Sequence, residues 1–194
     1  MGKREKGREV HHMDLVEPAL RYLASYVDAL KRGWSPDASA EGAQRLLERI
    51  ADDREGFLAT ERDPHRARVM VTLPDGKRIP CPPGVARWIW NGEFCGRIWL
   101  RWSGYGVELP RYWLGHVAYE VVPWKQRRGY ATNALRQILP EARSLGLPYI
   151  DVVADIENVA SQRVILSNGG VLIDRLDESS TNGGGEALRF RIAL

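Results

Sequence analysis

The sequence predicts one α/β domain, of the α+β kind, in which helices flank a mixed β-sheet. Three observations lead to this class. Apolar residues recur with helical spacing in three stretches, at 20–30, 39–54 and 130–145. β-prone runs, some with a period of two, occupy much of the remaining sequence. The chain has 194 residues, of which 44% are hydrophobic, so it is long enough for one domain with a sizeable core.

The first part of the chain is predicted to contain a strand and then two helices. The strand covers 10–16. Pro18 suits the start of the first helix and Gly33 its end, because proline fits a first helical turn and glycine fits a C-terminal cap. The second helix covers 39–54. From residue 57 the helical pattern ends, and we place strands at 66–72, 85–90 and 97–102.

Turns and loops separate these strands. Pro74-Asp75-Gly76 is a turn signature, and the proline-rich stretch 80–84 predicts a stiff loop. Asn91-Gly92-Glu93 predicts the turn of a hairpin between the strands at 85–90 and 97–102. Residues 103–114 predict a loop long enough to suggest a function.

The second part of the chain alternates strands and helices. A strand at 115–122 is closed by Pro123, and the amphipathic pattern at 130–145 predicts a helix. Pro140 lies inside that helix and should kink it or split it near Leu139, since proline removes a backbone donor. The remaining elements are a strand at 149–154, a helix at 158–167, a strand at 171–174, a flexible turn at 183–185 and a half-buried strand at 188–194.

Charge and composition exclude several classes of protein. The formal net charge is +3, and residues 1–12 carry +2 of it, from four basic and two acidic side chains. We expect these residues to be a solvated tail that could be disordered, followed by one domain over 13–194, with no nucleic-acid partner. No apolar run approaches the roughly 18 residues of a membrane helix, so we expect a cytoplasmic protein without a membrane partner. Cys81 and Cys95 lie too far apart for a metal or redox motif.

The stretch 126–131, between a strand and a helix, predicts an anion site. The first turn of a helix has backbone N–H groups without intrahelical partners, and the helix dipole adds partial positive charge there. Lys125, Arg127 and Arg128 add full positive charges. Gly129 lets an anion approach the backbone without a Cβ in the way. A phosphate or a diphosphate fits such a place.

The same stretch resembles part of a known family. Residues 126–131 have the pattern Q-x-x-G-x-A, which resembles the acyl-CoA signature Q/R-x-x-G-x-G/A of the GNAT superfamily of N-acetyltransferases. A second block, N-x-x-S at 158–161 followed by the glycines 169–170, resembles the helix and strand that complete the CoA cleft of that family. The two blocks cover about residues 115–173, and the pattern looks like a bacterial branch known only as predicted acetyltransferases.

The resemblance implies a GNAT-like fold, with a mixed, mostly antiparallel sheet that splays between its fourth and fifth strands. In the family this opening admits the pantetheine arm of acetyl-CoA, which is the implied cofactor, with CoA as product. Val121 and Val122 would lend backbone groups to the arm, while Asn158 and Ser161 would approach it from the second block. Asn158 also suits a helix N-cap. The turn for the diphosphate would consist of Gln126, Arg127, Arg128, Gly129, Tyr130, Ala131 and Thr132.

Transfer to an amine also requires a proton acceptor, because a free alkyl amine is mostly protonated at neutral pH. His116 and Glu120 are the candidates, and strand alternation places them on one face. A single histidine is also a common structural hydrogen-bond partner. Asp155 and Glu108 are outside candidates.

The leaving thiolate needs a proton donor, and here the chain departs from the family. Many members carry a tyrosine seven residues after the asparagine of the second block, where this chain has Ile165. Tyr119 or Tyr130 could take over that role, or water could do so.

The resemblance implies direct transfer of an acetyl group to a primary amine of a small molecule or peptide, by a monomer or a homodimer. The alternative is a non-catalytic module that senses acyl-CoA or acts as a scaffold. Six of the seven tryptophans lie between Trp88 and Trp124, and they could form either sheet core or an aromatic wall for the acceptor. Tyr112 and Trp113 in the long loop best fit the wall, and Trp124 could cover the cofactor.

Overall fold

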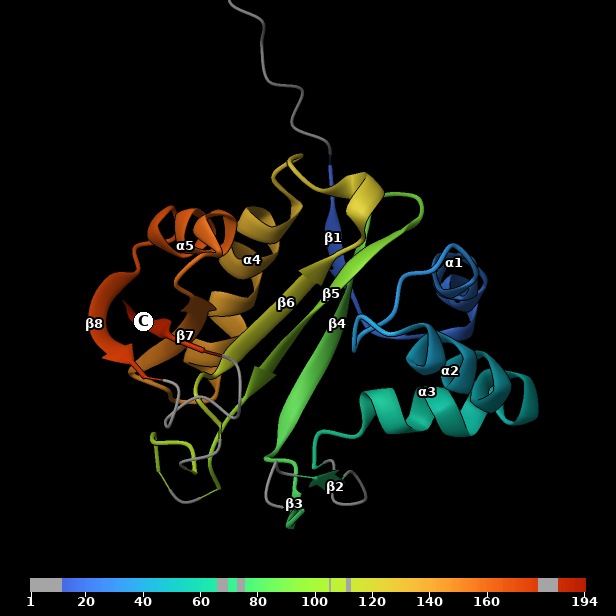
Figure 1. Ribbon diagram of the computed structural model, residues 1–194, viewed down its shortest axis with the longest axis horizontal. Coiled ribbons are helices and arrows are strands. Elements are labelled where there is room, and N and C mark those ends of the chain that lie inside the picture. Colours follow the sequence, from blue (N-terminus) through green and yellow to red (C-terminus); the bar gives the residue numbers. More distant parts are fainter. Residues whose placement is uncertain (1–11, 66–69, 73–75, 105, 111–112, 178–184) are drawn as a thin grey trace, which may run out of the picture.

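The computed structural model describes residues 12–65, 70–72, 76–104, 106–110, 113–177 and 185–194 (Figure 1). Its centre is a seven-stranded sheet of order β1-β4-β5-β6-β7-β9-β8. Among the described strands of this sheet only β6 and β7 pair in parallel, so the sheet is mixed and mostly antiparallel, as predicted. The strands are β1 (Asp14–Val16), β4 (Gly84–Trp90), β5 (Phe94–Arg101), β6 (Val117–Val121), β7 (Tyr149–Asp155), β8 (Val171–Leu176) and β9 (Ala187–Ala193).

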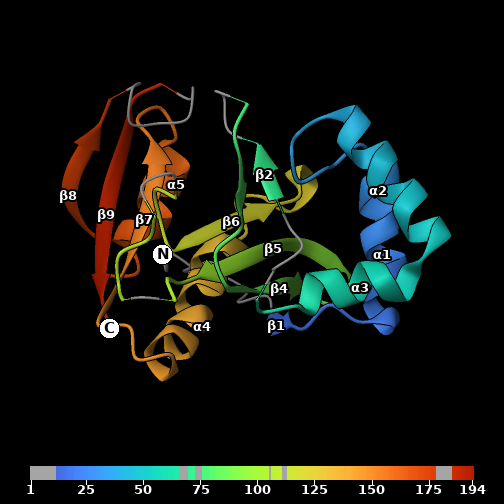
Figure 2. The same ribbon diagram turned by 90° about the horizontal axis from the view of Figure 1, so that it is seen from below.

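The sheet separates two hydrophobic cores. Figures 1 and 2 show α1, α2 and α3 grouped together, apart from α4 and α5. The core against the first group includes Trp88 and Val122, and the core against the second includes Ile98 and Val117. Neighbouring positions of a strand point to opposite faces, so one strand can serve both cores. The helices are α1 (Leu20–Lys31), α2 (Ala40–Asp52), α3 (Arg54–Arg62), α4 (Tyr130–Ser144) and α5 (Val159–Leu166).

The predicted second helix at 39–54 is confirmed as α2, and a further helix that the sequence analysis did not predict, α3, follows it. Asp53 has extended backbone angles, and its carboxylate accepts a hydrogen bond from Gly56 N–H at 2.8 Å, so it ends α2 and caps α3. The sequence analysis placed no element between residues 54 and 66, and α3 lies there with Phe57 and Leu58 buried.

A small separate sheet follows α3. Its strands, β2 (Met70–Thr72) and β3 (Arg78–Pro80), pair antiparallel. The predicted strand at 66–72 is confirmed only for its last three residues, since 66–69 lie outside the described residues, as do Pro74 and Asp75 of the predicted turn. The stretch predicted as a stiff loop contributes Pro80 to β3 and Gly84 to β4. The β4–β5 hairpin forms as predicted.

Helix α4 runs unbroken through Pro140, so the predicted split near Leu139 is wrong. Pro140 is on the exposed side of the helix, where a carbonyl deprived of its intrahelical donor can bond water. Strand β8 extends two residues beyond the prediction, to Leu176. Residues 1–11 of the predicted tail, Tyr112 and most of the turn at 183–185 lie outside the described residues. No helix in the described part of the chain has the length and apolar character to cross a membrane.

The predicted splay lies between β6 and β7, the fourth and fifth strands of the sheet order. The two strands share one register pair, Val117 with Val152, and Figure 1 shows them running apart beyond it. A Cβ on Gly115 would lie 3.0 Å from Asp151 O, so the absence of a side chain allows the strands to approach there. Beyond this point the described residues of β6 and β7 form no further ladder of backbone hydrogen bonds.

His116 ties the two strands together at this junction. Its backbone N–H donates to Asp151 O at 2.7 Å, and its ring Nδ1 accepts from Asp151 N–H at 2.9 Å. Ring Nε2 lies 2.9 Å from Val107 O and must donate to it, so the ring is neutral with its proton on Nε2. The side chain is buried. His116 therefore joins β6, β7 and the loop before β6.

We predict that His116 makes the stability of the fold depend on pH below about 6.5. Burial lowers the pKa of His116, although the bond to Val107 O and the charge of Asp151 act in the opposite direction. The unfolded chain then binds the proton more readily than the folded chain. Stability is fully present above about 6.5, the unfolded histidine pKa, and is lost as pH falls towards the folded pKa.

Denaturant unfolding at about pH 7.5 and about pH 5.5 measures this difference. His116→Gln should lower stability at the higher pH and flatten its pH dependence. His12→Gln changes an exposed histidine and is the matched control. Identical pH slopes for the wild type and His116→Gln would contradict the assignment.

Candidate functional site

The predicted anion site forms at the start of α4. A short 3-10 helix, η1 (Pro123–Lys125), leads into residues 126–129, which we call the glycine loop. Arg127 has φ 60° and Gly129 has φ 82°, so two residues of the loop are left-handed. Helix α4 begins at Tyr130 without a side-chain cap and without an acidic residue in its first turn. The loop therefore ends in an uncapped helix N-terminus.

The first turn of α4 offers three backbone donors. The first intrahelical bond is Asn133 N–H to Gly129 O at 3.0 Å. The N–H groups of Tyr130, Ala131 and Thr132 consequently have no partner inside the helix. A Cβ built on Gly129 would meet nothing within 4 Å, so the approach to these donors is open. This geometry suits a phosphate group.

The charges around the loop differ in part from the prediction. Arg127 and Arg128 are exposed beside the donors. Lys125, expected to add a third charge, is instead buried and forms an ion pair with Glu93. Its charge is therefore already neutralised within the protein, and the loop itself presents two guanidinium groups to solvent.

The end of β6 has fewer open backbone groups than expected. Val122 N–H donates to Cys95 O at 3.0 Å, and Val122 O accepts from Lys125 N–H at 2.9 Å. The side-chain amide of Gln126 donates to Val121 O at 3.1 Å. Both backbone groups of Val122 thus have partners within the chain. Gln126 fastens the loop to the strand instead of pointing away from the protein.

The second block lies across the splay from β6. Asn158 caps α5, with its Oδ1 accepting from Ser161 N–H at 3.0 Å, so its N-cap role is confirmed. Ser161 Oγ lies 2.7 Å from the hydroxyl oxygen of Tyr119 on β6. Burial raises the pKa of Tyr119 to about 12, so the hydroxyl keeps its proton at neutral pH. The Tyr119–Ser161 pair bridges the two sides of the splay.

Ile165 occupies the position where the family often carries tyrosine. Its side chain is fully buried and packs against Gly170, where a Cβ would lie 2.4 Å from Ile165 Cγ2. Gly170 N–H donates to Ile165 O at 3.1 Å and ends α5. Ile165 and the glycines 169–170 therefore form a close-packed helix end. The other candidate proton donor is Tyr130, whose hydroxyl oxygen accepts a hydrogen bond from the side-chain amide of Asn91.

The two candidate bases have different surroundings. Both ring nitrogens of His116 are engaged, as described above. Glu120 lies near the end of β6, and its Oε1 accepts from Arg97 Nη2 at 3.2 Å. Burial raises the pKa of Glu120 above its ordinary value, and the neighbouring Arg97 offsets part of that rise. The outside candidates Asp155 and Glu108 are exposed.

Arg97 is a site residue that the sequence analysis missed. It is 5% exposed, and its Cζ lies 3.6 Å from the ring centroid of Trp99. Register pairs Arg97 with Glu120 on the adjacent strand. Alternation along β5 gives a signal that Arg97 and Trp99 share a face. The pairing with Glu120 depends on the register between β5 and β6, which the sequence does not reveal.

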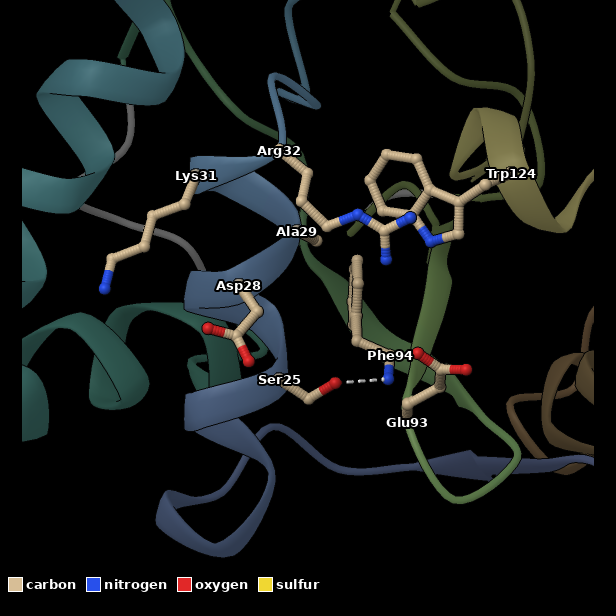
Figure 3. Close-up of a pocket in the computed structure, with 8 residues that line it drawn as sticks. All are labelled: Ser25, Asp28, Ala29, Lys31, Arg32, Glu93, Phe94 and Trp124. Carbon is tan, nitrogen blue, oxygen red and sulfur yellow. Dashed lines mark hydrogen bonds between the residues drawn. The ribbon is translucent and has the colours of Figure 1, made fainter.

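The tryptophans divide between packing and surface roles. Trp88 is fully buried and stacks on Tyr26, with ring centroids 4.7 Å apart, so it belongs to the core. Trp124 of η1 faces Arg32, the residue directly after α1, whose Cζ lies 3.7 Å from the ring centroid. Figure 3 shows this stack at a cavity of about 300 Å³ between α1, the β4–β5 turn and η1. Trp113 stacks with Arg101, at 4.9 Å.

Solved structures with a similar fold include several acetyltransferases. The microcin C7 self-immunity acetyltransferase MccE, solved with acetyl-CoA and AMP, has a TM-score of 0.59 at 12% identity, covering 94% of this chain and 92% of that one. Mycobacterium smegmatis RimJ, in complex with CoA-disulfide, has a TM-score of 0.59 at 18% identity, covering 93% and 81%. RimL, a ribosomal L7/L12 alpha-N-protein acetyltransferase in complex with CoA, has 0.59 at 12%, covering 94% of each chain.

Sequence comparison gives the family directly. No curated protein matches the chain with significance. A profile of the acetyltransferase (GNAT) domain matches residues 17–171, which is most of the chain and includes both sequence blocks. The chain therefore belongs to the GNAT family of acetyltransferases.

Proposed function

We propose that this acetyltransferase moves the acetyl group of acetyl-CoA directly to a primary amine of a small molecule or peptide, with the cofactor's diphosphate on the glycine loop. The observation that carries the proposal is the open first turn of α4. Three unpartnered backbone donors lie there next to two exposed arginines, at the strand end where the sheet opens. A diphosphate gains both hydrogen bonds and charge compensation at such a place.

Each part of the loop has a role in this proposal. Acetyl-CoA supplies a reactive acetyl thioester, and its diphosphate provides the negative charge that the loop binds. Tyr130, Ala131 and Thr132 donate backbone N–H groups, and Arg127 and Arg128 add positive charge. In this proposal the pantetheine arm lies in the splay, with Val121 of β6 on one side and Asn158 and Ser161, at the start of α5, on the other.

Glu120 is the proton acceptor in this proposal. An ammonium group has a pKa of about 10.4 and must lose its proton before it can attack the thioester. A carboxylate with a raised pKa accepts a proton more readily than an ordinary one, and Arg97 holds Glu120 in place. His116 would first have to release Val107 or Asp151, which would open the junction of β6 and β7.

Tyr119 is the proton donor. Glu120 first takes the ammonium proton and passes it to solvent. The neutral nitrogen then forms its bond to the acetyl carbon as the carbon–sulfur bond breaks, Glu120 takes the second nitrogen proton, and the Tyr119 hydroxyl protonates the sulfur. A hydroxyl with a pKa of about 12 keeps its proton at neutral pH and so has one to give as the thiolate leaves. Ser161 fixes its direction, at 2.7 Å. Tyr119 thereby takes the role that Ile165 cannot fill.

A second candidate function is acyl-CoA sensing without transfer. Ile165 favours it, because the position that carries a tyrosine in many relatives is a buried core residue here. The Tyr119–Ser161 pair favours transfer.

A panel of amines decides between the two functions and tests the acceptor class. Purified protein is mixed with acetyl-CoA and either a small primary amine, a peptide with a free N-terminus or a peptide with an acetylated N-terminus and a lysine. Thiol release is recorded. A tertiary amine of similar size serves as the control. We expect thiol release above background with at least one primary amine and none with the tertiary amine. Tight CoA binding without release on the whole panel would support the sensor.

We predict that Gly129→Glu reduces CoA affinity by roughly 100-fold or more, because a carboxylate would lie beside the diphosphate. Gly146→Glu is the matched control. Gly146 lies after the opposite end of α4, with φ 78° against 82° for Gly129, and a Cβ on either meets nothing within 4 Å. Both changes bring the same backbone strain and the same charge. Calorimetry should show normal affinity for Gly146→Glu, and equal affinities for the two variants would refute the site.

We predict that Glu120→Gln lowers kcat about 100-fold or more and removes the acidic limb of the pH–rate profile. The pKa of Glu120 is raised, so the wild-type rate should fall on acidification at a pH above the usual carboxyl range. Below the pKa the carboxyl is protonated and cannot accept the amine proton. Glu157→Gln, at an exposed glutamate, is the control. An unchanged acidic limb in Glu120→Gln would remove this residue from the mechanism.

A further inference from the structure

The turn of the β4–β5 hairpin contacts the chain on both sides of the glycine loop. Glu93 pairs with Lys125, the residue directly before the loop. The side-chain amide of Asn91 donates to the hydroxyl of Tyr130, the residue directly after it. One three-residue turn, Asn91-Gly92-Glu93, thus holds both ends of a four-residue loop.

The Asn91–Tyr130 contact is shielded from water, whereas the Glu93–Lys125 pair joins a buried lysine to a half-exposed carboxylate. Lys125 is 8% exposed and Tyr130 is 2% exposed. The thiol of Cys95 donates to Asn91 Oδ1 at 3.0 Å, which leaves the amide nitrogen of Asn91 to face Tyr130. Shielded bonds of this kind are stronger than the same bonds on the surface. The turn is therefore itself fixed before it fixes the loop.

A third contact holds η1 from the other side. Figure 3 shows Arg32, the residue directly after α1, against Trp124. Ser25 of α1 accepts a hydrogen bond from Phe94 N–H, next to the hairpin turn, with an N–O distance of 2.8 Å. The end of α1 and the turn therefore both contact the segment that enters the loop. These contacts hold the residues on either side of the glycine loop, Lys125 before it and Tyr130 after it.

The loop needs such support because its backbone is strained. Arg127 is left-handed at φ 60°, a conformation that costs a residue with a Cβ about 1 kcal/mol. Strained conformations persist only where the surroundings impose them. A loop that ordered only on binding would also lose about 1 kcal/mol or more of backbone entropy for each residue fixed.

We propose that the Asn91–Glu93 turn is a positioning element for CoA, which presets the glycine loop so that its N–H groups converge before the cofactor arrives. Asn91 and Glu93 act through Tyr130 and Lys125 and touch no part of the cofactor. The proposal rests on the proposed function, since it assumes that the glycine loop binds the diphosphate. It makes CoA affinity, and not the chemical step, depend on this turn.

The sharpest test is Glu93→Gln, because two explanations predict opposite signs. If Glu93 acted only through its charge, its removal beside an anion site would tighten CoA binding. If it positions Lys125, its removal should weaken CoA binding. We expect the Kd for CoA by calorimetry, and the KM for acetyl-CoA, to rise about fivefold or more, with kcat within about twofold of wild type. Tighter or unchanged binding would overturn the proposal.

A double-mutant cycle tests the other end of the loop. Asn91→Ala and Tyr130→Phe each remove one half of the same hydrogen bond, and Tyr130→Phe keeps the ring, so it should fold even if Asn91→Ala does not. We expect each change to raise the Kd for CoA about fivefold, and the double variant to be no weaker than the weaker single one. Multiplicative losses, or no loss in Tyr130→Phe, would overturn the assignment.

Another contact supplies the control. Arg87 of β4 pairs with Glu141 of α4 at 2.6 Å, so it joins the same hairpin to the same helix far from the loop. Arg87→Gln should lower the stability of the fold and leave CoA affinity unchanged. If Arg87→Gln lost as much CoA affinity as Glu93→Gln, the loss would be a general effect of lower stability, and the proposal would be overturned. Gly129→Glu separates the proposed CoA site from the positioning role of the turn. Normal CoA binding by Gly129→Glu would show that the site itself is wrong. Loss of CoA binding in Gly129→Glu, together with normal binding by Glu93→Gln, would overturn the positioning role alone.

Discussion

The arrangement of the site depends on the short contact between β6 and β7. These strands share one register pair, and beyond it they diverge. If they stayed paired, the backbone donors of β6 would be used up by a ladder, and no space would remain between β6 and α5. His116 and Gly115 make the contact close but brief, the first by its two hydrogen bonds to Asp151 and the second by its missing side chain. The opening of the sheet is thus explained by a few local bonds.

The two faces of the sheet carry different groups of the proposed active site. The face towards α4 and α5 carries Tyr119, and the face towards α1, α2 and α3 carries Glu120 with Arg97. Successive residues of one strand therefore reach opposite sides of the sheet. In the proposed reaction the proton acceptor acts on the amine nitrogen and the proton donor on the sulfur, from these two sides, which keeps the two groups from neutralising each other.

The glycine loop and the hairpin could be predicted from the sequence because their signals are local. The pattern at 126–131 and the Asn91-Gly92-Glu93 turn each fit within six residues. Helix α3 was missed because it has 9 residues, so its buried apolar positions, Phe57 and Leu58, are too few to establish a helical period. The pairs Arg97–Glu120 and Asn91–Tyr130 join residues 23 and 39 positions apart, so they depend on strand register and packing that no short pattern encodes. Lys125 was misjudged for the same reason, since its partner lies in a distant turn.

Cys95 shows what the buried hairpin turn means for redox chemistry. Burial raises the pKa of its thiol to about 11, and the thiol is committed as a donor to Asn91. Thiolates, not thiols, exchange with disulfides. A reactive cysteine thiolate beside the cofactor would exchange with oxidised CoA, a disulfide, and form a mixed disulfide. In this chain the Cys95 sulfur, beside the turn that holds the glycine loop, is kept as an unreactive hydrogen-bond donor and is protected from that exchange.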